Sequence, residues 1–303
     1  MNKKSSLYLL IVLIAMIVIP SNTSVISQRN NIGDTLPFQT SERINETSRF
    51  KNKYKRNKGN HARSENKRYS QNVIVPPFVS VTNPNHNYPI GLFLYGNASI
   101  EGACTASVIN TFNGNIGLTA AHCLLDEDGN PWDLNFTSFS PGYDNNSNGP
   151  LGDILVVATA IPNNFIVNRR KYDYPLVRFE FNRGGATLQE YTGALGWRFD
   201  IGNNEPTSVY GYPSGNFEDC PNDNEHLCKW QGITEKYTDY YAINNLIAED
   251  GVSGGPFISQ YDANTNLGYV YALMRGVFIR TNVSFGSNWD EDIFIDLLLE
   301  ITP

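Results

Sequence analysis

The chain has 303 residues, of which 41% are hydrophobic and 12% aromatic, enough apolar material for one large or two small folded domains. Its charge is unevenly divided. Residues 1–68 carry 13 basic and 4 acidic side chains, a net of +9, whereas the remaining 235 residues carry 10 and 26, a net of −16. An acidic domain of this kind repels phosphates, so we expect no nucleic acid among its partners.

Residues 1–24 have the layout of a secretory signal peptide. Lys3 and Lys4 precede an apolar run at 7–19, which ends at Pro20 and small polar residues. The run is shorter than the about 20 residues that a membrane span needs, although a signal anchor remains the alternative. We therefore expect a secreted, extracellular protein with no membrane attachment after the signal is removed.

Residues 25–70 are rich in Asn, Ser, Lys and Arg and poor in large apolar side chains, so they cannot bury enough surface to fold alone. We interpret them as the basic, disordered propeptide of a zymogen, removed near Lys67 and Arg68. Its charge is opposite to that of the following domain. The alternative is a flexible tail that binds anionic surfaces.

From residue 73 onward, short apolar runs alternate with Gly, Pro and Asn, which is typical of an all-β sandwich or barrel. Residues 289–301 differ, because apolar side chains recur there at helical spacing behind an acidic start. We expect a C-terminal helix docked on the second half of the domain. The predicted strands are 73–75, 90–95, 105–109, 116–120, 154–160, 176–181, 208–212, 240–243, 256–259 and 269–279.

Ser253 lies in a glycine-rich stretch, residues 251–256, where little blocks its hydroxyl or the neighbouring N–H groups. A serine needs a base to remove its proton, and that base needs a carboxylate to fix its tautomer. His122 is the candidate base. Asp173 is the preferred carboxylate, with Asp153 as the alternative.

The order His122, Asp173, Ser253 is that of the triad on chymotrypsin-type double barrels. Together with four short runs, it makes residues 88–300 resemble the trypsin-like serine peptidases, and most closely the secreted glutamyl-endopeptidase-like (V8-like) branch. The four runs are Cys104–Val108, Thr119–Cys123, Tyr210–Pro213 and the Ser253 stretch.

This resemblance implies two six-stranded antiparallel barrels, which we place at 75–190 and 191–288, with the C-terminal helix completing the second unit at 303. His122 and Asp173 would lie on the first barrel and Ser253 on the second, so that the site occupies the cleft between them.

Four cysteines in a secreted chain suit structural disulfides, and three pairings are possible. We expect Cys104–Cys123 and Cys220–Cys228, and the resemblance implies the first. A zinc site would need His226 beside Cys228, and we expect neither a metal nor another cofactor.

The backbone N–H groups of Gly251 and Ser253 would hold the oxyanion. Trypsin-type zymogens usually have aspartate just before the serine, where it pairs with a new N-terminal amine. Val252 stands at that position and offers no charge, so activation by that ion pair does not carry over to this chain.

Substrate preference remains open in the sequence. Ile247 stands where enzymes that cut after Lys or Arg have aspartate, and the histidine of the V8-like branch is missing from the stretch 272–276. Arg275 either binds an acidic side chain or lies outside the pocket. Ile247, Ala248 and Met274 could instead line a pocket for small or apolar side chains.

The sequence thus predicts a monomeric secreted serine endopeptidase acting on proteins or peptides. The rival hypotheses are a catalytically silent protein that uses the cleft for binding, and an esterase. Sequons at Asn97, Asn135, Asn145 and Asn282 would make it a glycoprotein in a eukaryotic secretory pathway.

Overall fold

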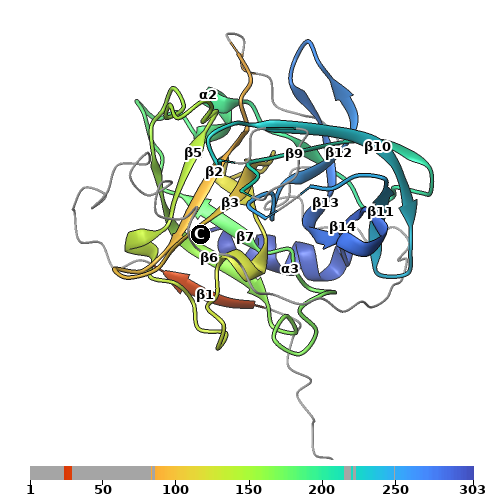
Figure 1. Cartoon of the computed structure of the whole chain (residues 1–303). Coiled ribbons are helices and arrows are strands. Elements are labelled where there is room, and N and C mark those ends of the chain that lie inside the picture. The colour runs from red at the N-terminus through yellow and green to blue at the C-terminus, as the bar shows by residue number, and fades with distance from the viewer. Residues whose placement is uncertain (1–23, 29–82, 84–85, 215–219, 221–222, 249) are drawn as a thin grey trace, which may run out of the picture.

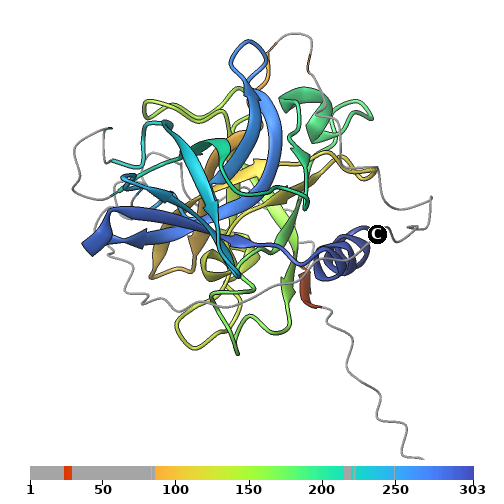
Figure 2. The same ribbon diagram turned by 90° about the vertical axis from the view of Figure 1, so that its right-hand side faces the viewer.

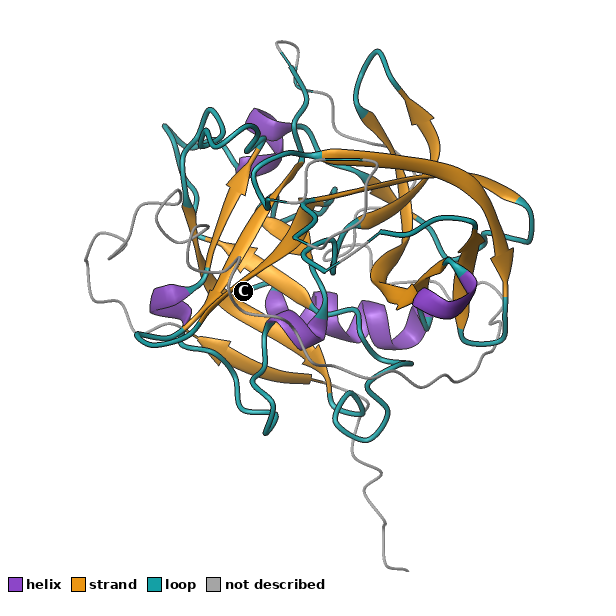
Figure 3. Ribbon diagram, in the orientation of Figure 1, coloured by secondary structure: helices purple, strands orange, loops and turns teal. Residues whose placement is uncertain are grey.

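The computed structural model describes residues 24–28, 83, 86–214, 220, 223–248 and 250–303. Within that part strands dominate, and they form two barrels that lie side by side (Figures 1 and 3). The expected signal peptide up to residue 23, most of the expected propeptide and the expected strand at 73–75 lie outside the described residues.

The first barrel consists of six antiparallel strands that close on themselves. The hydrogen-bonded order is β6, β5, β2, β3, β4, β7, and β7 returns to β6. Its interior is apolar, and Phe139 stacks on Phe179 at 4.6 Å between ring centroids. The strands are β2 (Ile90–Gly96), β3 (Glu101–Val108), β4 (Ile116–Leu118), β5 (Ser138–Pro141), β6 (Ile154–Pro162) and β7 (Leu176–Phe179).

The second barrel closes in the same way, in the order β12, β9, β10, β11, β14, β13, with β13 returning to β12. A short strand β8 (Gly196–Trp197) joins β13 in parallel as the chain enters this barrel. The six barrel strands are β9 (Glu205–Gly211), β10 (Cys228–Lys236), β11 (Tyr240–Asn244), β12 (Pro256–Asp262), β13 (Leu267–Phe278) and β14 (Val283–Asn288).

The predicted fold class of two six-stranded antiparallel barrels is therefore confirmed. Each strand predicted from residue 90 onward overlaps an observed strand. The sequence missed β5, β8, β10 and β14. In β10, polar side chains such as Lys229, Gln231 and Glu235 interrupt the apolar pattern, because much of the strand is exposed.

Strand β1 (Ser24–Gln28) was not expected, because it falls at the end of the predicted signal peptide and in the segment predicted to be disordered. It pairs antiparallel with the second half of β6, from Ser24 opposite Pro162 to Gln28 opposite Ala158. The first barrel therefore gains a seventh strand at its edge (Figure 1).

The C-terminal helix is present as α3 (Glu291–Ile301), but its position differs from the prediction. Asp290 caps it by accepting a hydrogen bond from the Ile293 N–H at 3.2 Å. The helix packs on β6 and β7 of the first barrel and beside β1, rather than mainly on the second barrel (Figure 2).

The helix position has a packing reason. The apolar face of α3 covers side chains of the first barrel such as Leu176, while Phe294 reaches Trp197 of β8 at 5.0 Å between ring centroids. Arg178 of β7 also donates to the Ile301 carbonyl at 3.1 Å. The helix thus contacts both barrels and buries its largest side chains where they meet.

The remaining helices are short and lie in connections: η1 (Ala121–Cys123), η2 (Leu134–Phe136), α2 (Leu188–Thr192) and η3 (Ile279–Thr281). Among the described residues, no helix has the length and apolar character needed to cross a membrane.

Candidate active site

His122 is held at the end of β4 by a covalent bond to the neighbouring strand. It lies in the single turn η1, directly before Cys123, and Cys123 forms a disulfide with Cys104 of β3 with 6.4 Å between Cα atoms. The predicted Cys104–Cys123 pairing is confirmed. The bridge fixes the turn, and with it the imidazole, against the barrel.

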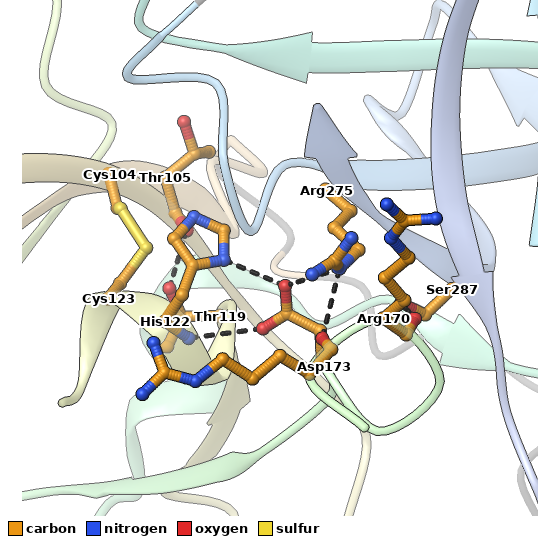
Figure 4. Close-up of polar contacts among 10 residues, drawn as sticks. Cys104, Thr105, Thr119, His122, Cys123, Arg170, Asp173, Arg275 and Ser287 are labelled. Atoms are coloured by element: carbon orange, nitrogen blue, oxygen red, sulfur yellow. Dashed lines mark hydrogen bonds and ion pairs between the residues drawn. A yellow bond between two sulfur atoms is a disulfide. The ribbon is translucent and has the colours of Figure 1, made fainter. Parts of the chain in front are cut away.

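Asp173 meets His122 with both carboxylate oxygens. The imidazole Nδ1 lies 2.7 Å from Oδ2, and the His122 backbone N–H donates to Oδ1 at 3.1 Å (Figure 4). The Asp173 side chain is fully buried, whereas 12% of the His122 side chain is exposed. His122 thus pairs with Asp173, the preferred candidate, rather than with Asp153. A histidine bonded through Nδ1 to a carboxylate has Nε2 left to accept a proton.

Burial and the charged neighbours of Asp173 act on its pKa in opposite directions. Burial alone raises the pKa of this carboxyl, but His122 and then Arg275 more than offset that effect and leave the pKa below its usual value. Arg275 lies on the opposite side of the carboxylate from His122, with Nε 3.0 Å from Oδ2 (Figure 4). From the sequence, Arg275 either binds an acidic side chain or lies outside the pocket; in the structure its charge faces Asp173.

The Ser253 loop, residues 250–255, is fastened to the first barrel through one residue, Thr105 of β3. The Thr105 N–H donates to the Ser253 carbonyl at 2.8 Å, and its hydroxyl donates to the Gly251 carbonyl at 3.0 Å. The same hydroxyl accepts the Tyr212 N–H at 3.1 Å. Since Thr105 follows Cys104 directly, one short segment positions both the imidazole and the serine loop.

The role of Thr105 was missed in the sequence. Thr105 is one of several polar residues in this largely buried strand, so its residue type alone does not reveal that its hydroxyl bonds the serine loop. Between the described residues, the structure gives the Ser253 hydroxyl no hydrogen bond to His122. Such bonds are often long without substrate and shorten when substrate is bound.

Gly251 has φ +87°, in the region that side chains rarely adopt, and a Cβ there would collide with the Tyr212 carbonyl and with Oδ1 of Asn224. The prediction that this position needs glycine for its backbone conformation is consistent with that geometry. Val252, next to it, is fully buried in the core of the second barrel, so its side chain fills space instead of forming an ion pair.

The expected pocket residues divide into two groups. Ala248 and Met274 are buried together with Val252 in one apolar cluster of the second barrel, and Ile247 is partly exposed beside them in sequence. Arg275 is 8% exposed and faces Asp173 instead. Met274 points into its own barrel, whereas Arg275 stands at a β-bulge of β13 and faces the first barrel.

The remaining cysteines form the predicted Cys220–Cys228 disulfide, which is also confirmed. His226 in that loop pairs with Asp223 at 2.9 Å. The atoms of Cys104, Cys123 and His122 lie close enough together to suggest a metal site, but the two sulfurs are bonded to each other and are not thiolates.

Two closed antiparallel barrels, with a histidine–aspartate pair on the first and a serine loop on the second, are the architecture of the chymotrypsin-like serine proteases, and the chain has that fold. Solved structures of serine proteases are similar to it over most of their length. One is the thermostable serine protease AL20 from an extremophilic microorganism, with 20% identity and a TM-score of 0.61 over 71% of this chain and 98% of that one.

A second is the protease Anisep from Arthrobacter nicotinovorans, with 19% identity and a TM-score of 0.61 over 74% of this chain and 99% of that one. A Glu endopeptidase is similar at 15% identity and a TM-score of 0.54, over 73% of this chain and 93% of that one. No protein-family profile and no curated protein sequence matches the chain. The likeness is thus one of fold.

Proposed function

We propose that the protein is a secreted serine endopeptidase that cleaves peptide bonds through an acyl-enzyme. Ser253 is the nucleophile, His122 the general base and Asp173 the carboxylate that orients it. The observation that carries the proposal is the 2.7 Å contact between His122 Nδ1 and the fully buried Asp173. The segment Cys104–Thr105 ties both this pair and the Ser253 loop to β3, through the disulfide to Cys123 and the Thr105 hydrogen bonds.

In the proposed reaction, the Ser253 hydroxyl attacks the substrate carbonyl as His122 Nε2 takes its proton, and His122 then delivers that proton to the leaving amine. The backbone N–H groups of Gly251 and Ser253 stabilise the negative oxygen of the tetrahedral intermediate. A water molecule then attacks the acyl-enzyme as His122 takes its proton, and the acid product leaves as the Ser253 hydroxyl is restored. Every step uses side chains or backbone groups of the chain, and no cofactor is needed.

Substrates are proposed to be proteins or peptides. Arg275 is paired with Asp173 and is therefore not available to bind an acidic substrate side chain, whereas Ile247 is partly exposed near the Ser253 loop. Secretion is supported by two disulfides, which persist in oxidising compartments. Glycosylation is proposed at Asn145 and Asn282, both of which are exposed.

The test is labelling of the matured protein with a fluorophosphonate, which reacts with an activated serine. We expect the native protein to be labelled, Ser253→Ala to be unlabelled and His122→Ala to react far more slowly. Ser107→Ala is the matched control: this buried hydroxyl on β3 has no hydrogen-bond partner in the described part of the chain, and its removal should leave labelling unchanged.

A native protein that is folded, has lost residues 1–70 and still fails to react would overturn the peptidase proposal. It would favour the hypothesis of a catalytically silent protein that binds ligands in the same cleft. Reaction with the probe but hydrolysis of esters alone would favour the esterase hypothesis.

A further inference from the structure

Arg275 is an unusual group to find behind a catalytic carboxylate. Its side chain is 8% exposed, and its Nε–H donates to the Arg169 carbonyl at 3.1 Å while lying 3.0 Å from Asp173 Oδ2. Its Nη1 is buried without a hydrogen-bond partner in the described part of the chain. Burial lowers the pKa of Arg275, and Asp173 only partly offsets this effect.

This placement of a buried charge destabilises the folded state. A buried charge loses its hydration, and a guanidinium nitrogen without a partner adds to that loss. An apolar side chain of similar volume would often serve stability as well or better. The second barrel nevertheless directs a full positive charge at the one carboxylate that the proposed triad depends on.

The surroundings show that the arginine is held in place. The β-bulge between Met274 and Gly276 lets Arg275 leave the regular register of β13 and reach the Asp173 loop, residues 163–175. Ser287 of β14 donates to the Arg170 carbonyl at 3.1 Å, next to the Arg169 carbonyl that receives Arg275. Two strands of the second barrel thus hold consecutive carbonyls of the loop that carries Asp173. Figure 4 shows Arg275, Arg170 and Ser287 beside Asp173.

We propose that Arg275 is a positioning residue for the triad: its guanidinium, anchored on the Arg169 carbonyl, holds the Asp173 carboxylate ionised and directed at His122. The expected effect on catalysis rests on the proposed function, whereas the ion pair between Arg275 and Asp173 is independent of it.

Charge around the pair determines how it responds to pH. Asp173 faces His122 from its own loop, and Arg275 faces Asp173 from β13. Arg170 stands close enough to Arg275 for the two charges to repel, and burial followed by that repulsion lowers the pKa of Arg170 to about 10. Arg169 and Lys171 share the loop, and on the Ser253 loop Asp250 is exposed to solvent.

Removing the positive charge of Arg275 makes it easier for the Asp173–His122 pair to take up a proton, so the coupled pair protonates at higher pH. A carboxyl whose pKa is lowered in the folded state stabilises the protein above its ordinary pKa, and the contribution is lost as pH falls through the lowered value. Without Arg275 the pKa of Asp173 is lowered less, so this contribution to stability is smaller and its loss is complete at a higher pH.

The experiment compares Arg275→Gln, Arg275→Lys and the control Arg178→Gln with the native protein. Arg178 also donates to a carbonyl, that of Ile301, but it lies on β7 and contacts helix α3. Each variant is checked for folding by circular dichroism. The pH dependence of kcat and kcat/KM is then measured, together with the titration of the His122 ring nitrogens by NMR of 15N-histidine-labelled protein.

For Arg275→Gln we expect the acid limb of kcat/KM and the midpoint of the ring titration both to rise by about one pH unit. We also expect kcat to fall about ten- to a hundredfold, because the imidazole is less well oriented, with KM nearly unchanged. Arg275→Lys should bring the acid limb, the ring titration and kcat most of the way back to the native values. Arg178→Gln should lower stability and leave the acid limb where it is.

An acid limb and a ring titration that do not move in Arg275→Gln would overturn the inference. So would a loss confined to KM for substrates with acidic side chains, which would make Arg275 a pocket residue. The NMR titration needs no turnover, so failure of the proposed peptidase activity is distinguishable from failure of this inference.

Discussion

The Thr105→Val variant tests the contribution of the Thr105 hydroxyl, because it removes the hydrogen bonds and keeps the packing of the side chain. Valine has nearly the same volume but no hydroxyl, so the Gly251 carbonyl loses its donor and the Tyr212 N–H loses its acceptor. The site is fully buried, and water cannot easily replace either bond. An unsatisfied buried N–H costs about 1–3 kcal/mol, so we expect the free energy of unfolding to fall by about 2 kcal/mol.

The same change should affect catalysis through Gly251. Loss of one oxyanion donor typically lowers kcat by about 10²–10³. Because the Thr105 N–H still holds the Ser253 carbonyl, we expect only part of this effect, about a tenfold loss of kcat. Stability is measured by urea unfolding in a Ser253→Ala background, which prevents self-digestion, and kcat is measured on the active form.

Thr105→Ser is the matched control, since it keeps the hydroxyl and removes only a methyl group. If Thr105→Val and Thr105→Ser have the same stability and the same kcat, the hydroxyl does not hold the serine loop, and the proposed link between the two barrels is wrong.

Two further predictions concern the same segments. Gly251→Ala should abolish measurable hydrolysis, because φ +87° and the Tyr212 carbonyl leave no room for a methyl group; full activity in a kinetic assay would contradict the proposed geometry. Replacing both Cys104 and Cys123 by Ser opens a link across 19 residues and should lower the free energy of unfolding by about 3 kcal/mol. A urea midpoint equal to that of the native protein would show that the disulfide does not stabilise the fold.

The elements closest to the chemistry were the easiest to predict from the sequence. His122 and Cys123 lie in adjacent positions, and their residue types restrict what they can do, so the disulfide and the candidate base could be proposed together. The strand pattern similarly predicted barrels, because short apolar runs with frequent turns permit few other arrangements.

Contacts between the barrels could not be predicted in the same way. Arg275 is 102 positions beyond Asp173 in the sequence, and nothing in the residues around either one indicates that they meet. The position of α3 was predicted wrongly for a related reason: its periodicity reveals an apolar face but not which surface that face covers. Strand β1 was missed because its few residues gain hydrogen bonds only from β6.

The position of α3 also sets an order of events during synthesis. Arg178 and Ile301, which bond to each other, are separated by 123 residues. At the usual rate of about 5–20 residues per second, β7 is made roughly 6–25 s before the helix that covers it. The face of the first barrel formed by β6 and β7 therefore stays uncovered until the whole second barrel has been synthesised.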